Sequence, residues 1–205
     1  MTHPSRRLVI AALALAPAGC SSLLGGGGPS ATLYTLTALT DFPAGPHFKL
    51  QVLFDRPTAS DALNTTRIAL RRNVLTVDYF ADAAWTDSAP SMIQSLLVDS
   101  LQSSGRVTAA SRDTLAIRGD VEVRIDVRHF EADYRSGQEL PTVRVELGLI
   151  LVRVEDRSIL ATDTVTASAQ PTKNEVSAIV VAFNQALQAA MRETLAWTLA
   201  HARAP

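Results

Sequence analysis

Residues 115–128, LAIRGDVEVRIDVR, carry the clearest strand pattern in the chain. Apolar side chains occupy the odd positions, which are Leu115, Ile117, Val121, Val123, Ile125 and Val127. Charged side chains occupy the even positions, which are Arg118, Asp120, Glu122, Arg124, Asp126 and Arg128. This alternation is typical of a strand with one buried face and one wet face. We therefore expect a β-sheet that is covered on one side.

The following segments repeat the pattern and predict an antiparallel meander. Residues 143–151 alternate after a loop around Ser136 and Gly137, and residues 159–169 form a further strand. Gly148 and apolar residues at the even positions 150, 152 and 154 predict a register change at a bulge. Earlier strands are expected at residues 33–36, 48–54, 67–70, 74–79 and 107–109, with Arg72 and Asn73 as a hairpin turn.

Two segments have the apolar spacing of helices. The first follows Trp85, with Asp87 or Ser88 as its cap, Pro90 in its first turn and Gly105 at its end. The second covers about residues 174–200, and its polar positions lack the lysine and arginine of a membrane-surface helix, which favours packing on the sheet. The expected fold class is α+β. It is a two-layer sandwich with a mixed or mainly antiparallel sheet of about five strands and two main helices on one face.

The N-terminus has the layout of an export signal. Arg6 and Arg7 precede an apolar run at residues 8–16, and small residues lead to Cys20, the only cysteine. The run is shorter than the roughly 20 residues that span a bilayer, so residues 1–19 are expected to be a removed signal peptide. Cys20 resembles the acceptor cysteine of a bacterial lipoprotein signal, which carries diacylglycerol and fatty acids such as palmitate. Pro17 departs from the usual aliphatic position, and a plain signal peptide or a core thiol are the alternatives.

Residues 20–32 are expected to form a lipidated tether, because four consecutive glycines at residues 25–28 are entropically hard to order. No Gly-Lys-Ser/Thr sequence follows them, which excludes a phosphate-binding loop. Residues 33–205 then form a single domain without an internal disulfide. Ser21, rather than Asp, follows the cysteine, and in lipoproteins this resembles the signal for the outer membrane.

Composition and motifs argue against most chemical functions. The net charge is −1 and the sequence shows no cluster of basic residues, so no nucleic-acid partner is expected. No hydrolase elbow, zinc motif or Walker sequence is present, and we expect no enzyme and no cofactor. His129, Glu131 and Asp133 are the best candidate metal ligands. The favoured interpretation is a polar strand end without metal, neutralised by Arg128 and Arg135.

The order of several segments resembles the ABC-type transport auxiliary lipoprotein family, whose members include the PqiC-like lipoproteins. The segments that carry the resemblance are residues 33–36, 64–69, 77–90, 128–133 and 180–187. It implies a non-catalytic lipoprotein on the outer membrane, facing the periplasm. Its implied partners are a periplasmic protein with a mammalian cell entry (MCE) domain and the associated ABC permease and ATPase, which move lipid or another apolar substrate. Homo-oligomerisation is left open.

Two other functions are weighed against docking. A lipid or hydrophobic-ligand carrier needs an apolar pocket between helices and sheet, and an envelope hydrolase needs a nucleophile with a partner base. Exposed edge strands suit docking, because their unpaired backbone groups accept a partner strand. Tyr34, Tyr79 and Trp85 are the candidate partner contacts if they are exposed, while Trp85 is favoured as a hydrophobic plug beneath the first helix.

Overall fold

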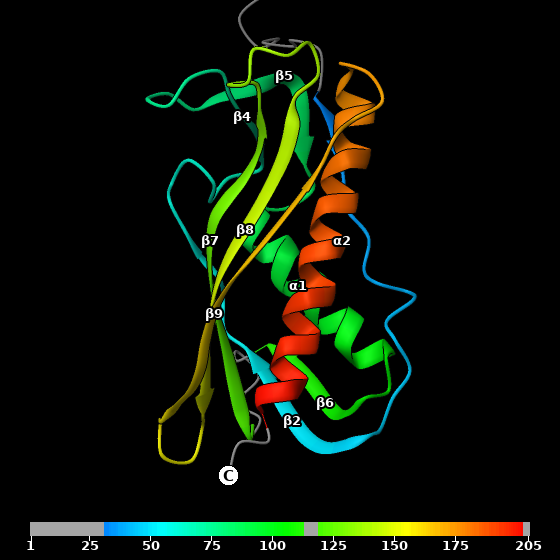
Figure 1. Ribbon diagram of the computed structural model, residues 1–205, viewed down its shortest axis with the longest axis vertical. Helices are drawn as coiled ribbons and strands as arrows, with labels where there is room; N and C mark the ends of the chain where they lie inside the picture. Colours follow the sequence, from blue (N-terminus) through cyan, green and yellow to red (C-terminus); the bar gives the residue numbers. More distant parts are fainter. Residues whose placement is uncertain (1–30, 113–118, 203–205) are drawn as a thin grey trace, which may run out of the picture. The chain divides into compact units, whose positions relative to one another are not determined.

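The structure is a computed structural model that describes residues 31–112 and 119–202. Within these ranges nine strands form one open mixed sheet, and two helices lie on one side of it (Figure 1). The strands are β1 (Thr32–Tyr34), β2 (Phe48–Phe54), β3 (Thr58–Ala59), β4 (Arg67–Arg71), β5 (Asp78–Trp85), β6 (Val107–Arg112), β7 (Val121–Asp133), β8 (Thr142–Arg153) and β9 (Ile159–Ala169). The helices are α1 (Ala89–Ser103) and α2 (Val176–His201).

Strand β7 is the centre of the sheet. On one side it pairs antiparallel with β8 along its whole length, and β8 pairs in turn with β9. On the other side β7 pairs in parallel with three short strands in succession, β2 at its start, β3 in the middle and β4 at its end. Strand β6 extends the sheet beside β2, while β5 and β1 extend it beside β4.

The predicted α+β class, the meander and the two helices on one face are confirmed, but the expected number of about five strands is wrong. Strand segments were expected at or near every one of these positions except the two-residue β3. The number in one sheet was wrong because the parallel pairing of the distant segments with β7 is made only through tertiary contact. The first half of the quoted stretch is only partly described, since residues 113–118 lie outside the described ranges and β7 begins at Val121.

The predicted register change occurs in the β8–β9 pairing between Leu151 and Val152, close to Gly148 but not at it, and β7 has a further bulge where it pairs with β8. Strand β8 keeps its odd residues buried through Leu151, whereas the β7 register shifts between Val127 and His129. Arg128 is therefore the extra residue, and beyond it the even positions of β7 face the core. Gly148 has a related role, because a Cβ there would lie 2.7 Å from the Arg128 guanidinium. The glycine leaves room for that side chain to lie across β8.

The β4–β5 hairpin pairs antiparallel as predicted, but its connection is longer than an Arg72-Asn73 turn. Leu70 pairs with Asp78, so the expected strand at residues 74–79 begins only at Asp78. The side-chain oxygen of Asn73 accepts hydrogen bonds from the backbone N–H groups of Leu75 and Thr76 at 2.9 and 3.0 Å. This Asx turn holds residues 73–76 in a loop, where the alternation of apolar residues had indicated a strand.

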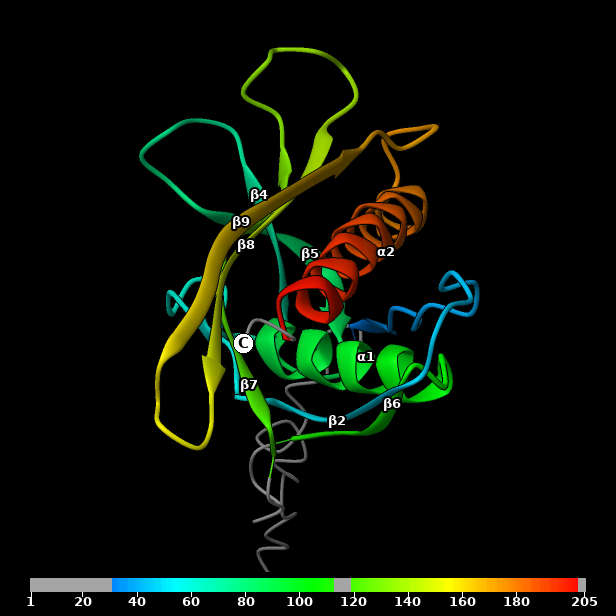
Figure 2. The same ribbon diagram turned by 60° about the horizontal axis from the view of Figure 1, so that its bottom comes forward.

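Both helices begin and end close to the predicted positions. Ser88 precedes α1 with an extended backbone, and a proline lies in the first turn. Gly105 follows α1 with φ of +62°, the left-handed conformation that favours glycine. Figure 2 shows α1 and α2 on the same side of the curved sheet. Within the described ranges neither helix is long and apolar enough to cross a membrane.

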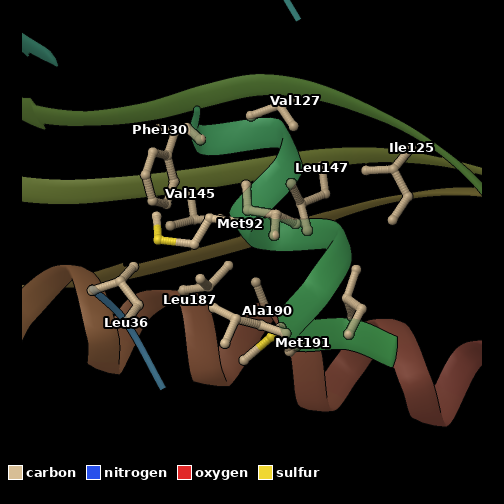
Figure 3. Close-up of a cluster of buried hydrophobic side chains, with 14 of the residues drawn as sticks. Leu36, Met92, Ile125, Val127, Phe130, Val145, Leu147, Leu187, Ala190 and Met191 are labelled. Atoms are coloured by element: carbon tan, nitrogen blue, oxygen red, sulfur yellow. The ribbon is translucent and has the colours of Figure 1, made fainter. Parts of the chain in front are cut away.

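The core lies between the sheet and the two helices. Trp85, Phe130 and Phe183 form an aromatic cluster, with ring centroids 5.0 to 5.8 Å apart. Next to it Met92 of α1 enters among sheet residues such as Val145 and Leu147 and the α2 side chains, including Leu187 and Met191 (Figure 3). These side chains are all at most 5 % exposed, so this part of the interior is filled.

Candidate functional site

The most distinctive surface feature is the free edge of β9. Among the described residues β9 pairs only with β8, so the backbone groups along its outer edge have no partner strand. Its sequence, ILATDTVTASA, has no proline and no lysine, which are the usual devices that protect an edge. The only register shift in its pairing lies near its start, which leaves residues 161–169 regular. This edge is long enough to accept an extended strand.

A shallow groove runs beside this edge on the outer face of the sheet, opposite the helices. It has a volume of about 800 Å³ and is lined by side chains of β7, β8 and β9 and by residues 55–58. Gly148 and the partly exposed Ile150 line it, and Arg128 crosses it to donate from Nη1 to Thr164 Oγ1 at 3.0 Å. Because three arginines and three aspartates line the groove, its formal charge is balanced.

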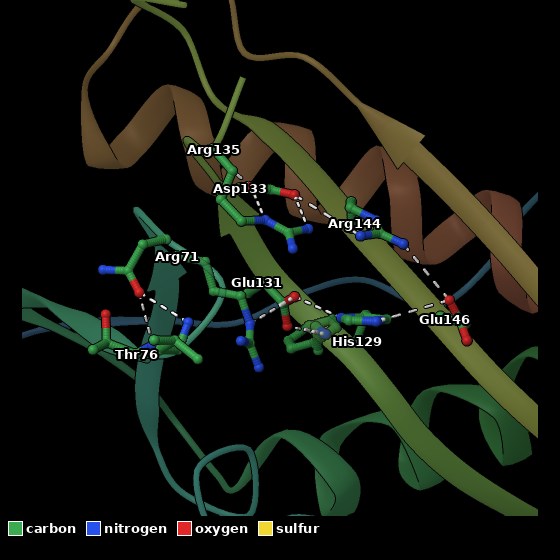
Figure 4. Close-up of polar contacts among 11 residues, drawn as sticks. Arg71, Thr76, His129, Glu131, Asp133, Arg135, Arg144 and Glu146 are labelled. Atoms are coloured by element: carbon green, nitrogen blue, oxygen red, sulfur yellow. Dashed lines mark hydrogen bonds and ion pairs between the residues drawn. The ribbon is translucent and has the colours of Figure 1, made fainter. Parts of the chain in front are cut away.

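A charged network covers the other half of the outer face (Figure 4). Glu131 is 1 % exposed, and its Oε1 lies 2.6 Å from Nδ1 of His129 and 3.3 Å from Nε of Arg71. The backbone N–H of Phe130 donates to Oε2 of the same carboxylate at 3.2 Å. Arg135 donates to both oxygens of Asp133, and this hydrogen bonding lowers the pKa of the Asp133 carboxyl.

These contacts bear on the candidate metal ligands His129, Glu131 and Asp133. They come from one strand, as the sequence indicated, but the carboxylates are held by Arg71 and Arg135. No group of three or more His, Cys, Asp or Glu residues suited to a metal ion occurs in the described part of the chain. Both carboxylates thus lie in ion pairs with arginine side chains. Arg71 was not anticipated, because it comes from β4, which joins β7 only through tertiary pairing.

The four other predicted site residues have different surroundings. Trp85 is 1 % exposed within the aromatic cluster and is not available to a partner. Tyr79 is half-buried, donates its hydroxyl to the Ala62 carbonyl at 3.1 Å and lies beneath the Arg67 guanidinium. Tyr34 is half-buried and pairs with Trp85 across β1 and β5. Cys20 lies outside the described residues.

The sequence did not identify which residues form the free edge of β9 and the groove beside it. Arg128, Gly148 and Thr164 come from three strands, and no local spacing places them together. A partial signal was present in the run of threonines and alanines at residues 159–169, which has a single charge. Such a composition is unusual for an edge strand that is protected against pairing.

Three comparisons relate the chain to known proteins. The family model described as "ABC-type transport auxiliary lipoprotein component" matches residues 34–194. An uncharacterized protein of Bradyrhizobium diazoefficiens is 31% identical over 89% of this chain and 49% of its own length, so the chain spans about half of that relative. A crystal structure of a Xanthomonas campestris protein of family DUF330 is 31% identical with a TM-score of 0.75, over 83% of this chain and 96% of that one.

A second crystal structure, of an uncharacterized protein, has a TM-score of 0.62 over 83% of this chain and 99% of that one. Its identity is 13%, so the likeness shows the fold alone. The family match extends from the last residue of β1 into the last third of α2 and therefore includes all of the sheet except the first two residues of β1.

Proposed function

Because the chain belongs to the family of ABC-type transport auxiliary lipoprotein components, we propose that it is a non-catalytic subunit that docks on the periplasmic MCE-domain protein of such a system. It acts from the outer membrane, facing the periplasm, and assists the passage of lipid or another apolar substrate between the membranes. The free edge of β9 is the observation that carries this proposal. A partner strand added there gains backbone hydrogen bonds, and the adjoining groove selects its side chains.

The packed interior favours docking over the carrier alternative. Apolar ligands are normally held in an enclosed apolar pocket. The aromatic cluster and Met92 occupy the space between sheet and helices, and the groove beside β9 is lined by six charged residues on the outer face. The carrier remains the second candidate, and lipid bound to the purified protein would favour it.

The proposal includes an anchored chain with a removed signal at residues 1–19, a lipidated tether at residues 20–32 and one domain at residues 33–205. The sequence around Cys20 supports this organisation. Cys20→Ala should release the protein into the soluble periplasmic fraction while its circular dichroism spectrum stays native. Persistent membrane retention of this variant would refute the anchor.

The docking test is crosslinking in intact cells, followed by affinity purification and mass spectrometry. The wild type should bring down an MCE-domain protein together with its permease and ATPase. Exchange of Thr166 and Ser168 on β9 for lysine should reduce this recovery roughly tenfold, which corresponds to about 1.4 kcal/mol of binding free energy. The matched control places two lysines at Gln185 and Ala189 on the exposed face of α2.

Unchanged recovery with the β9 variant would refute docking through this edge. An equal loss in both variants would point to added charge rather than to strand addition. Recovery of no MCE-domain protein, with phospholipid bound to the isolated protein, would favour the carrier instead.

A further inference from the structure

The connection between β4 and β5 exposes two adjacent aliphatic side chains. Val74 is 69% exposed and Leu75 is 91% exposed, more than any other large apolar residue among those described. Single exposed apolar residues are common on protein surfaces. A neighbouring pair at the tip of a projecting loop is less usual, and Figure 2 shows this loop standing away from the sheet and the helices.

The exposed pair is held in position by local hydrogen bonds. Asn73 accepts from the backbone of Leu75 and Thr76, and this Asx turn fixes the backbone around the tip. The base of the loop is tied to the sheet, because the Tyr134 N–H donates to the Arg71 carbonyl at 2.7 Å. The loop therefore presents its aliphatic side chains outward, and little conformational entropy is lost when they bind.

The neighbouring charge suits a phospholipid surface. Arg72 is exposed directly before the turn and has no acidic side chain in contact with it among the ion pairs of the described residues. Arg71 and Arg135 nearby are already engaged by Glu131 and Asp133. An exposed arginine beside aliphatic side chains matches the boundary between phosphate head groups and acyl chains.

Strand β1 begins on the side of the sheet from which β5 leaves the loop. Strand β1 runs parallel to β5, with Thr32 opposite Ala83, and β5 begins at Asp78 immediately after the loop. The five residues from Ala83 back to Asp78 would span about 17 Å in a regular strand, and the register shift of β5 against β4 makes the separation shorter. A Gly-rich coil of the twelve residues from Cys20 to Ala31 would span about 20 Å. An anchor at Cys20 keeps a bilayer within reach of the loop.

We propose that Val74 and Leu75 insert into the phospholipid surface that carries the lipid anchor, with Arg72 at the phosphate groups. This inference rests on the anchor of the proposed function, because two aliphatic side chains are too few to hold a protein on a membrane alone. The tether supplies the high local concentration at which a weak contact is occupied. The contact orients the domain, with the β4–β5 end against the membrane and the β8–β9 turn directed away.

The test uses the acylated full-length mature protein in vesicles of phosphatidylethanolamine and phosphatidylglycerol. Acylation blocks the thiol of Cys20, so a Leu75→Cys variant carries a single reactive thiol for an environment-sensitive fluorophore. The matched control is Ile159→Cys, since Ile159 is 63% exposed and lies at the opposite end of the sheet. The two ends are separated by ten residues of β8, or about 33 Å.

The expected result is a blue-shifted emission at position 75 that loses most of its intensity when the lipids carry a quencher, with no change at position 159. Adding Val74→Ser should weaken this quenching. Unquenched emission at position 75 in a protein that is acylated and inserted overturns this inference and leaves the anchor intact. Burial of the probe only after the MCE component is added also overturns it. Mass spectrometry that finds Cys20 unmodified overturns the anchor and this inference together.

Discussion

Replacement of Glu131 by glutamine tests whether the outer-face network stabilises the sheet. The substitution keeps the shape of a side chain that is 1 % exposed and removes its charge. It leaves His129 and Arg71 facing an amide, at contacts that are now 2.6 and 3.3 Å to Oε1. Arg71 Nε is buried and has no hydrogen-bond partner of its own, so the carboxylate is what balances its charge.

The magnitude follows from the burial of the three groups. Removing one partner from a fully buried ion pair costs about 3–5 kcal/mol. The side chains of Arg71 and His129 are 23% and 27% exposed, so water recovers part of that cost. We expect the free energy of unfolding to fall by about 2 kcal/mol. For a domain of this size, that lowers Tm by about 4–8 °C.

The assay is urea and thermal unfolding of the Cys20→Ala protein with and without the substitution. Glu146→Gln is the matched control, because this glutamate is on the neighbouring strand, 22% exposed, with its nearest cations at 3.7 and 4.0 Å. It should change stability by less than about 0.5 kcal/mol. Equal effects of the two substitutions would refute the reasoning. If Arg71 is the stranded charge, adding Arg71→Met to Glu131→Gln should restore about 1 kcal/mol.

Three further substitutions test single contacts. Arg135 lowers the pKa of Asp133, so the native state binds fewer protons there; the resulting stability is full above about pH 5 and is lost as the pH falls through the folded pKa. Arg135→Ala should therefore flatten the loss of the urea midpoint between about pH 5 and pH 3, and an unchanged slope would contradict this origin. Phe183→Ala should cost about 3–5 kcal/mol in urea unfolding, against less than about 0.5 kcal/mol for the exposed Val181→Ala on the same helix. In Gly105→Ala the added Cβ has no atom within 4 Å, but the backbone keeps φ at +62°, which an L side chain rarely adopts. Thermal unfolding should therefore show a free energy of unfolding lower by about 1 kcal/mol, and an unchanged value would exclude backbone strain.

The predicted site illustrates where local pattern stops being informative. The alternation along β7 placed His129, Glu131 and Asp133 on one face correctly, because side chains of a strand alternate with period two. It did not reveal that Glu131 would be buried, since the covering Arg71 belongs to a strand about sixty residues earlier. Trp85 was favoured from the sequence as a hydrophobic plug, and its contact with Phe130 in the core agrees with that interpretation. The half-burial of Tyr34 and Tyr79 depends on packing that the sequence does not display.

The sequence by itself determined the long meander, both helices, the export signal as an expectation and the resemblance to the family that the comparisons show. These features depend on the spacing of apolar residues or on contiguous motifs, which a linear chain displays directly. Tertiary structure alone decided the parallel strands beside β7 and the free edge of β9. It also decided that the start of β1 and the Val74–Leu75 loop lie toward the same end of the sheet. Pairing between distant segments is settled by which faces and edges can be buried together, and that competition involves the whole domain at once.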